Sequence, residues 1–258
     1  MAEPIIQFQE VTMAFGSKVV LDKVSFDVYA GETLAVIGPS GCGKSTVLKL
    51  VIGLLTPNSG HIIIKGRDVI DFTEDEWNEL RKDMGMVFQY SALFDFLNVG
   101  ENVAFGLRQH TNKSEKEIQE IVAKMLEMVG LPGIEAEEPA ELSGGMKKRV
   151  SLARAIALEP ELVLYDEPTA GLDPIMANVI SELILKTKAT LGVTSLLVTH
   201  DMGSAFMAAD KIALLNQGHI EAMGTVAEIK KSSNKLVQQF IRGELFVEKN
   251  RKEGVASE

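Results

Sequence analysis

The sequence predicts an α/β fold, a parallel β-sheet with an inserted helical subdomain. Three short apolar runs carry this prediction: "TLAVI" at residues 33–37, "LVLYDEP" at residues 162–168 and "TSLLVTHD" at residues 194–201. Continuous apolar runs of this length are typical of strands buried on both faces. Each run precedes a segment with helical patterning, and strands that alternate with helices form parallel sheets with helical crossovers. No strand pattern occurs between about Tyr90 and Glu159, so the helical subdomain is expected there.

The other segments fit a single domain with one insertion. "KVSFDV" at residues 23–28 alternates apolar and polar residues, as a half-buried strand does. The segment after Ser114 is expected to be helical, because Ser114 and Glu117 can form a capping box and apolar residues follow at helical spacing. Gly130 can end that helix. We therefore expect an α/β core at residues 1–89 and 160–233, a helical subdomain at 90–159, and a C-terminal tail at 234–258 that ends in the polar, frayed segment "KNRKEGVASE".

Composition and charge narrow the class of protein. The 258 residues are 46% hydrophobic and 24% charged, which is ordinary for a soluble globular protein with a sizeable core. The formal net charge of −10 argues against a nucleic-acid binder, which usually presents a basic face. No uncharged apolar run approaches the roughly 18 residues that span a bilayer, and no signal-peptide pattern is visible. The single cysteine, Cys42, cannot form an internal disulfide, and these features together fit a cytosolic protein with no transmembrane span of its own.

The segment "GPSGCGKST" at residues 38–46 predicts a site for nucleotide phosphates. It matches the P-loop pattern G-x-x-x-x-G-K-[ST] in full, and it follows a buried strand and opens a helix, as a P-loop does. The glycines let backbone N–H groups turn inward around phosphates. Lys44 can reach the β- and γ-phosphates, and the Ser45 hydroxyl can bind Mg²⁺. The residues expected to bind the nucleotide here are Gly38, Pro39, Ser40, Gly41, Cys42, Gly43, Lys44, Ser45 and Thr46.

Two carboxylates, Asp166 and Glu167, end the second buried strand. An apolar strand that ends in Asp-Glu can simply place both carboxylates in solvent. Together with the P-loop, however, the pair predicts a reaction centre. Asp166 would hold Mg²⁺ through water, and Glu167 would act as the general base on the attacking water.

A second anion-binding pattern lies in "ELSGGMKKRVSLARA" at residues 141–155. Ser143, Gly144 and Gly145 immediately precede a basic amphipathic helix. A hydroxyl, free backbone N–H groups and the positive end of a helix dipole would thus gather at one point. This loop has no lysine of its own, so it is better suited to complete a phosphate site begun elsewhere than to hold a nucleotide alone.

The order of these motifs resembles the nucleotide-binding domains of ABC transporters. The P-loop is followed by "VFQ", "LSGG", "LYDEP", "GLDP" and "VTHD", and the resemblance covers roughly residues 5–230. In that family the "LSGG" loop of one subunit closes on the γ-phosphate held by the P-loop of the other, so that two ATP molecules are buried in a head-to-tail dimer. The resemblance therefore implies an ATPase that uses ATP and Mg²⁺ and pairs with a second copy of itself. It also implies a small antiparallel β region at the N-terminus.

The resemblance also assigns roles residue by residue. Phe15 matches the aromatic residue that stacks on adenine. Gln89 matches a glutamine that touches Mg²⁺ and the attacking water and joins the core to the helical subdomain. Asp173 matches a residue that contacts the opposite subunit, and His200 matches a histidine that hydrogen-bonds the γ-phosphate and orients Glu167. The expected catalytic residues are Lys44, Gln89, Glu167 and His200, the expected metal-binding residues are Ser45, Gln89 and Asp166, and further nucleotide contacts are expected from Ser143, Gly144, Gly145 and Asp173.

Three further details resemble the ATPases of MCE-associated, Mla-type phospholipid transporters. They are "ALFDFLNVGENVAFGLRQH" at residues 92–110, Met146 directly after "LSGG", and "LVQQFIRGEL" at residues 236–245. This resemblance implies lipid transport by a partner permease, with an MCE-domain lipid-binding protein in the same system. It also implies a peripheral position on the cytoplasmic face of the inner membrane.

The segment at residues 90–103 corresponds to the place where transporters of this family receive a coupling helix from the membrane subunit. We therefore expect some of its apolar side chains, with Leu97 and Phe94 as candidates, to be exposed. Two alternatives remain open. One is the ATPase of another importer, for example for amino acids, which usually has glutamine where this chain has Met146. The other is a soluble ABC protein that acts on ribosomes or DNA, which usually carries two cassettes or a long coiled-coil insertion.

Overall fold

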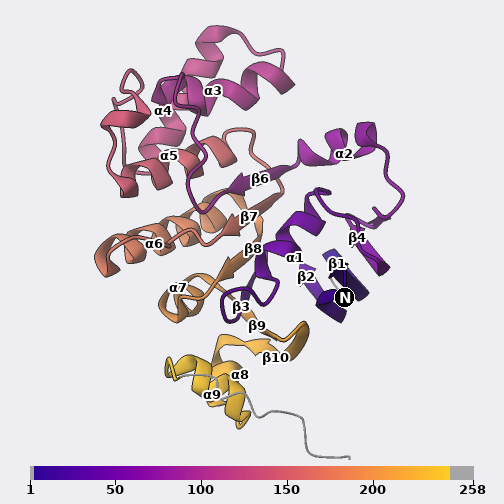
Figure 1. The fold of residues 1–258 in the computed structure, drawn as a ribbon. Helices are drawn as coiled ribbons and strands as arrows, with labels where there is room; N and C mark the ends of the chain where they lie inside the picture. The colour runs from indigo at the N-terminus through magenta and orange to yellow at the C-terminus, as the bar shows by residue number, and fades with distance from the viewer. Residues whose placement is uncertain (1–2, 245–258) are drawn as a thin grey trace, which may run out of the picture.

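The computed structural model describes residues 3–244 and contains two β-sheets and a separate group of helices (Figure 1). The strands are β1 (Pro4–Phe15), β2 (Lys18–Tyr29), β3 (Thr33–Ile37), β4 (Ser59–Ile64), β5 (Arg67–Asp68), β6 (Met84–Val87), β7 (Leu162–Asp166), β8 (Thr194–Thr199), β9 (Lys211–Asn216) and β10 (His219–Thr225). The helices are α1 (Lys44–Val51), α2 (Glu74–Arg81), α3 (Val99–His110), α4 (Glu115–Met128), the 3-10 turn η1 (Pro139–Glu141), α5 (Gly144–Ile156), α6 (Pro174–Leu191), α7 (Met202–Ala208), α8 (Val226–Lys231) and α9 (Lys235–Ile241).

The larger sheet has the order β10-β9-β3-β8-β7-β6, and all its strands run parallel except the edge strand β10. The three apolar runs predicted to be buried strands are β3, β7 and β8, so that prediction is confirmed. Leu34 and Val36 of β3 face the core shared with α1 and the N-terminal sheet, whereas Ala35 and Ile37 face the core shared with the helices. Because parallel strands end at one edge, the residues that follow β3, β7 and β8 are brought together there.

The smaller sheet is antiparallel where β1 pairs with β2 and β4, in the order β2-β1-β4-β5. This is the N-terminal antiparallel region that the sequence led us to expect. Its inner face is apolar, and the rings of Phe8 and Phe26 stack across neighbouring strands with centroids 4.5 Å apart. The segment expected as a half-buried strand at residues 23–28 lies within β2.

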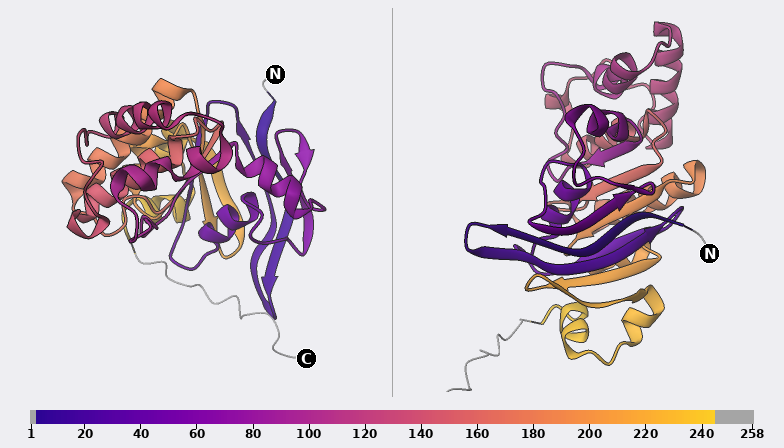
Figure 2. Two further views of the ribbon diagram at one scale, coloured as in Figure 1. Left: turned by 90° about the horizontal axis from the view of Figure 1, so that it is seen from above. Right: turned by 90° about the vertical axis from the view of Figure 1, so that its right-hand side faces the viewer.

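The helical subdomain contains α3, α4 and α5 and lies at the opposite side of the molecule from the N-terminal sheet (Figures 1 and 2). No strand occurs between β6 and β7 in the described chain, as predicted. The expected capping box of α4 is present: Ser114 accepts from the Glu117 backbone N–H, and the Glu117 side chain accepts from the Ser114 N–H. Gly130, at φ 71°, follows the end of the helix.

The described part of the predicted C-terminal tail is largely helical. The sequence placed residues 234–258 in a tail, but the first part of this stretch forms α9, whose Val237 is buried. The polar end "KNRKEGVASE" lies outside the described residues. Among residues 3–244, no helix is both long enough and apolar enough to cross a bilayer.

Candidate active site

The loop at residues 38–46 joins β3 to α1 and is shaped by glycine. Gly43 has φ 109°, a conformation that other residues rarely adopt, and a side chain at Gly38 would come within 2.2 Å of the Leu215 carbonyl oxygen. Helix α1 begins at Lys44 without a side-chain cap. The first N–H groups of an uncapped helix are free to bind an anion, so the loop and the helix start together suit a phosphate.

Lys44 is buried, and its ammonium group is held inside this loop. Its Nζ donates to the carbonyl oxygens of Gly38 at 3.0 Å and Pro39 at 3.2 Å. The same Nζ lies 3.5 Å from Oε1 of Glu167, which follows β7. The lysine therefore sits between the two motifs that the sequence predicted to work together.

Ser45 and Asp166 lie side by side, with the Ser45 hydroxyl donating to Asp166 Oδ1 at 2.9 Å. Burial raises the pKa of the Asp166 carboxyl, while the hydrogen bond from Ser45 acts in the opposite direction. Hydroxyl and carboxylate oxygens are ligands that suit Mg²⁺, which commonly takes one or two carboxylates and completes its shell with water and substrate phosphates. Within the described chain, no group of three His, Cys, Asp or Glu side chains is arranged so that it could hold a metal ion, so any Mg²⁺ here would depend on such outside oxygens.

Glu167 is held from two sides. Its Oε2 accepts from the backbone N–H of His200 at 3.2 Å and lies 2.8 Å from His200 Nδ1. With an ionised Glu167 carboxylate, which can only accept, Nδ1 donates this bond and Nε2 is left for another partner. The Glu167 side chain is buried, whereas the imidazole is half-exposed. A buried carboxylate that is oriented by a histidine and faces a lysine can accept a proton at a fixed position.

Ser143, Gly145 and Asp173 belong to a second group. The Ser143 hydroxyl accepts from the Met146 N–H and caps α5, while Asp173 accepts from Ile175 and Met176 and caps α6. Gly145 lies against Met176, because a side chain there would come within 2.5 Å of its Cε. Among residues 3–244, no hydrogen bond or ion pair joins this group to Lys44 or Glu167. Phe15, at the end of β1, is 49% exposed and likewise stands apart.

Gln89 follows β6 and is linked to the first group by a residue that the sequence analysis missed. The buried ammonium group of Lys148 donates to the carbonyl oxygens of Gln89 and Glu167, the latter at 3.4 Å. Burial lowers the pKa of Lys148. The available signal was helical spacing: Lys148 is four residues before Leu152 on the buried face of α5.

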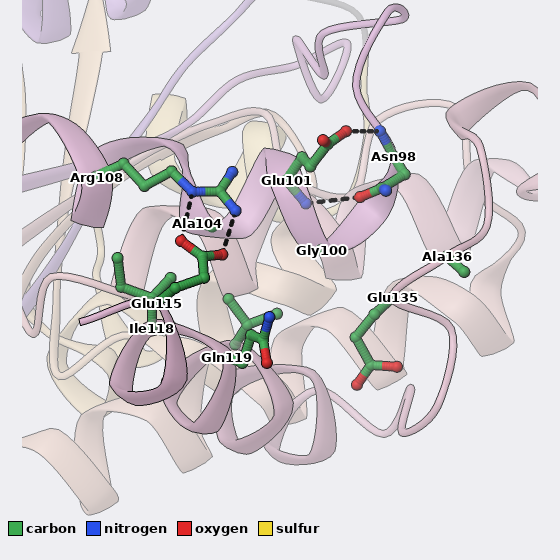
Figure 3. A pocket seen from close by; sticks show the side chains of 11 residues that line it. Asn98, Gly100, Glu101, Ala104, Arg108, Glu115, Ile118, Gln119, Glu135 and Ala136 are labelled. Carbon is green, nitrogen blue, oxygen red and sulfur yellow. Dashed lines mark hydrogen bonds and ion pairs between the residues drawn. The ribbon is translucent and has the colours of Figure 1, made fainter. Parts of the chain in front are cut away.

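Two of the hollows differ in their relation to the predicted site. A cavity of about 230 Å³ lies beside the loop, lined by Val20 and by residues between Gly41 and Thr46. Another, of about 520 Å³, lies in the helical subdomain between α3 and α4, and none of the predicted site residues lines it (Figure 3). Its polar groups are largely paired with each other, as in the bonds from Arg108 to Glu115.

Comparisons with known proteins identify the family of the chain. The family model described as ABC transporter matches residues 21–170. The chain is 42% identical over 238 residues to the probable ribonucleotide transport ATP-binding protein mkl of Mycobacterium leprae, covering 92% of this chain and 69%, about two thirds, of that protein. It is 41% identical over 244 residues to the intermembrane phospholipid transport system ATP-binding protein MlaF of Haemophilus influenzae, covering 95% of this chain and 92% of that protein.

A solved structure matches at the level of the fold. It is the dimeric post-hydrolysis state of the ATP-binding cassette MJ0796 bound to ADP and Pi, with a TM-score of 0.79 and 31% identity, covering 86% of this chain and 98% of that chain. The chain therefore belongs to the ABC transporter family. It has the fold of the ATP-binding cassette and is an ATPase of that class, as the order of its motifs led us to expect.

Proposed function

We propose that this chain is the ATP-hydrolysing subunit of a phospholipid transporter and that two copies bind two ATP molecules between them, head to tail. The observation that carries the ATPase site is the contact of Lys44, Glu167 and His200 at one edge of the sheet. The match to MlaF, which extends over nearly the full length of both chains, supports the lipid substrate.

Within one chain, the first group would carry out the chemistry. Lys44 and the backbone of residues 38–46 would bind the phosphates, and Ser45, Asp166 and Gln89 would hold Mg²⁺. The metal ion would neutralise the charge that develops on the transferred phosphoryl group. A carboxylate oxygen of Glu167 would accept the proton of the attacking water, and His200 would keep that carboxylate in place.

The second group would serve the ATP of the partner copy. The hollow beside the loop, about 230 Å³, is below the roughly 300 Å³ at which pockets for small molecules begin, so one chain encloses only part of a nucleotide. Ser143, Gly144 and Gly145 from the partner would close the phosphate side, with Asp173 at the same contact. Phe15 would stack on adenine, which its half-exposed ring allows.

An aromatic surface marks the proposed contact with the permease. We call Tyr90, Phe94, Phe96 and Phe105 the docking patch. Tyr90 is 87% exposed and Phe96 81% exposed. The partly buried Phe94 supports the patch, with its ring centroid 5.6 Å from that of Phe96 and 4.8 Å from that of Phe105. Exposed aromatic residues gathered in one place are typical of a protein interface.

In this proposal, the chain works on the cytoplasmic face of the inner membrane, bound to the permease and served by an MCE-domain lipid-binding protein. Leu97, which the sequence offered as an interface residue together with Phe94, is also partly buried. Substitutions at these two positions would test folding as much as docking. Tyr90 and Phe96 are the better probes.

The interface experiment compares Phe96→Glu with Leu54→Glu, because Leu54 is also strongly exposed, at 60%, but lies outside the patch after α1. Both variants are expected to fold and to hydrolyse ATP as the parent chain does. Only Phe96→Glu is expected to lose the permease when the complex is purified from native membranes. If Phe96→Glu retained the permease, the docking patch would be wrong.

The substrate experiment identifies the permease and the molecules that co-purify with the parent complex by mass spectrometry. Phospholipid is the expected result. Bound ribonucleotide, the cargo named for the mycobacterial relative, or a permease of the amino-acid-importer type would replace the lipid assignment and leave the ATPase intact. Copurification with ribosomes or DNA, without a permease, would favour the non-transport alternative.

A further inference from the structure

Helix α5 contacts both the Gln89 segment and Glu167 through the side chain of Lys148. Its N-terminus carries Ser143, and one turn further on Lys148 reaches into the protein. The Lys148 ammonium group bonds to the backbone carbonyl oxygens of Gln89, after β6, and Glu167, after β7. The helix, the Gln89 segment and the general base are thereby joined at one atom.

Burying this ammonium group costs free energy, which indicates that Lys148 has a role other than stabilising the fold. Lys148 is 6% exposed, and its described bonds go to two carbonyl oxygens rather than to a carboxylate. The Glu167 and Asp166 carboxylates attract this charge without hydrogen-bonding to it, so its pairing is incomplete, and apolar residues of similar size are often neutral or stabilising at such positions. The Glu167 carbonyl also accepts from the Ala170 N–H at 3.1 Å, so it does not depend on Lys148 for a partner.

We propose that Lys148 is a positioning residue for ATP hydrolysis, which ties Gln89 and Glu167 to the helix that carries the Ser143 loop. This inference rests on the proposed function. In a closed pair of chains, movement of the Ser143 loop onto the partner's ATP would then be rigidly linked to the placement of Gln89 and Glu167 on the chain's own ATP. One buried side chain would couple the two sites.

The same helix continues the link toward the docking patch. Arg154 donates to the carbonyl oxygens of Ser91 at 2.9 Å and Ala92 at 2.6 Å, and its guanidinium lies 5.6 Å from the centre of the Phe94 ring. Ser91 and Ala92 have positive φ values of 63° and 48°. Arg154 therefore braces a turn that is unfavourable for these residues. Lys148 thus holds Gln89, at the start of the segment, and Arg154 holds Ser91 and Ala92 next along it.

The test compares Lys148→Met with Lys147→Met in the full chain. Lys147 is the neighbouring lysine on the same helix, and no described contact uses its side chain. For Lys148→Met we expect kcat to fall by about tenfold or more, because misplacing catalytic groups by about 1 Å can cost up to about 100-fold. We expect the KM and Kd for ATP to stay within about twofold of the parent, and the melting temperature not to fall. Lys147→Met is expected to match the parent in all four quantities.

A background substitution distinguishes positioning from a general structural effect. If Lys148 acts through Gln89, adding Lys148→Met to Gln89→Ala should lower kcat little further, because residues that act together are not additive. Independent, multiplying losses would overturn the proposal, and so would an unchanged kcat in Lys148→Met. If Lys148→Met fails to fold, Lys148→Gln replaces it: its amide can keep the bond to the Gln89 carbonyl but not the one to Glu167, so we expect a smaller but measurable fall in kcat, and an unchanged kcat would overturn the proposal. A parent chain that did not hydrolyse ATP would count against the proposed function rather than against the link.

Discussion

Replacing Glu167 by glutamine removes one charge from the centre of the site and little else. The glutamine carbonyl oxygen can still accept from the backbone N–H of His200, which the Glu167 carboxylate does at 3.2 Å. What is lost is the capacity to accept a proton from water. General-base catalysis contributes typically 10²–10⁴-fold, so kcat should fall by that factor, equivalent to about 3–5 kcal/mol of transition-state stabilisation.

The same substitution is expected to preserve or strengthen ATP binding. Glu167 Oε1 lies 3.5 Å from Lys44 Nζ, and at about 4 Å such an attraction is worth at most about 4 kcal/mol in an effective dielectric constant of 20. With ATP bound, Lys44 would face a phosphate, and the Glu167 carboxylate would repel the same phosphate. Removing the carboxylate therefore removes a competitor for Lys44 without removing a nucleotide contact.

The assay combines phosphate release, calorimetry and light scattering. With Mg²⁺ and ATP, the Glu167→Gln chain should bind ATP, release phosphate at least 100-fold more slowly than the parent, and run as a dimer, because both phosphate loops stay occupied and nothing resets them. The Glu167→Gln chain remaining a monomer under these conditions would refute the shared-site arrangement. Hydrolysis within tenfold of the parent would refute the assignment of the general base.

Three other perturbations separate the parts of the site. Lys44→Ala should abolish most ATP binding. It should also lower the melting temperature, because Glu167 is left buried without the Lys44 cation. Near-normal ATP affinity, measured by calorimetry, would refute the assignment of the P-loop. Ser143→Arg should abolish hydrolysis while ATP binding to the isolated chain stays within about twofold of the parent, and an equal loss of both would mean that the loop serves its own ATP. Asp166→Asn should raise the melting temperature at neutral pH: burial raises the folded-state pKa of this carboxyl above its ordinary value, so stability is lost as pH rises from the ordinary pKa to the folded-state pKa. The gain should be constant above the folded-state pKa and disappear as pH falls from there to the ordinary pKa, and a gain that does not depend on pH would contradict the reasoning.

Much of the core sheet and of the site at its edge could be predicted, because short stretches of sequence specify the buried strands. The apolar runs at β3, β7 and β8 specify buried strands, and parallel strands must bring their following residues to one edge. Lys44, Asp166 and His200 could therefore be placed together before any contact was known.

What local sequence could not supply were the contacts that depend on packing between distant segments. Lys148 and Lys147 are adjacent and identical, and only the fold decides which of them is buried. Similarly, "FDF" at residues 94–96 contains two phenylalanines of equal hydrophobicity, of which Phe96 is exposed and Phe94 packs beneath it. The sequence analysis did not predict helix α9. So short a helix depends on packing against the rest of the protein, and the local sequence does not show which surface buries Val237.

Glu167 occupies a backbone conformation that suits a different residue. Its φ of 46° lies in the left-handed region, where a side chain with a β-carbon costs of order 1 kcal/mol and glycine costs nothing. Glycine would relieve that strain but would also remove the carboxylate beside buried Lys44, so selection for heat resistance with no demand for turnover would weigh the backbone strain against this ion pair. A library selected in this way would show which part of the chain's thermal tolerance has been given up for its reaction.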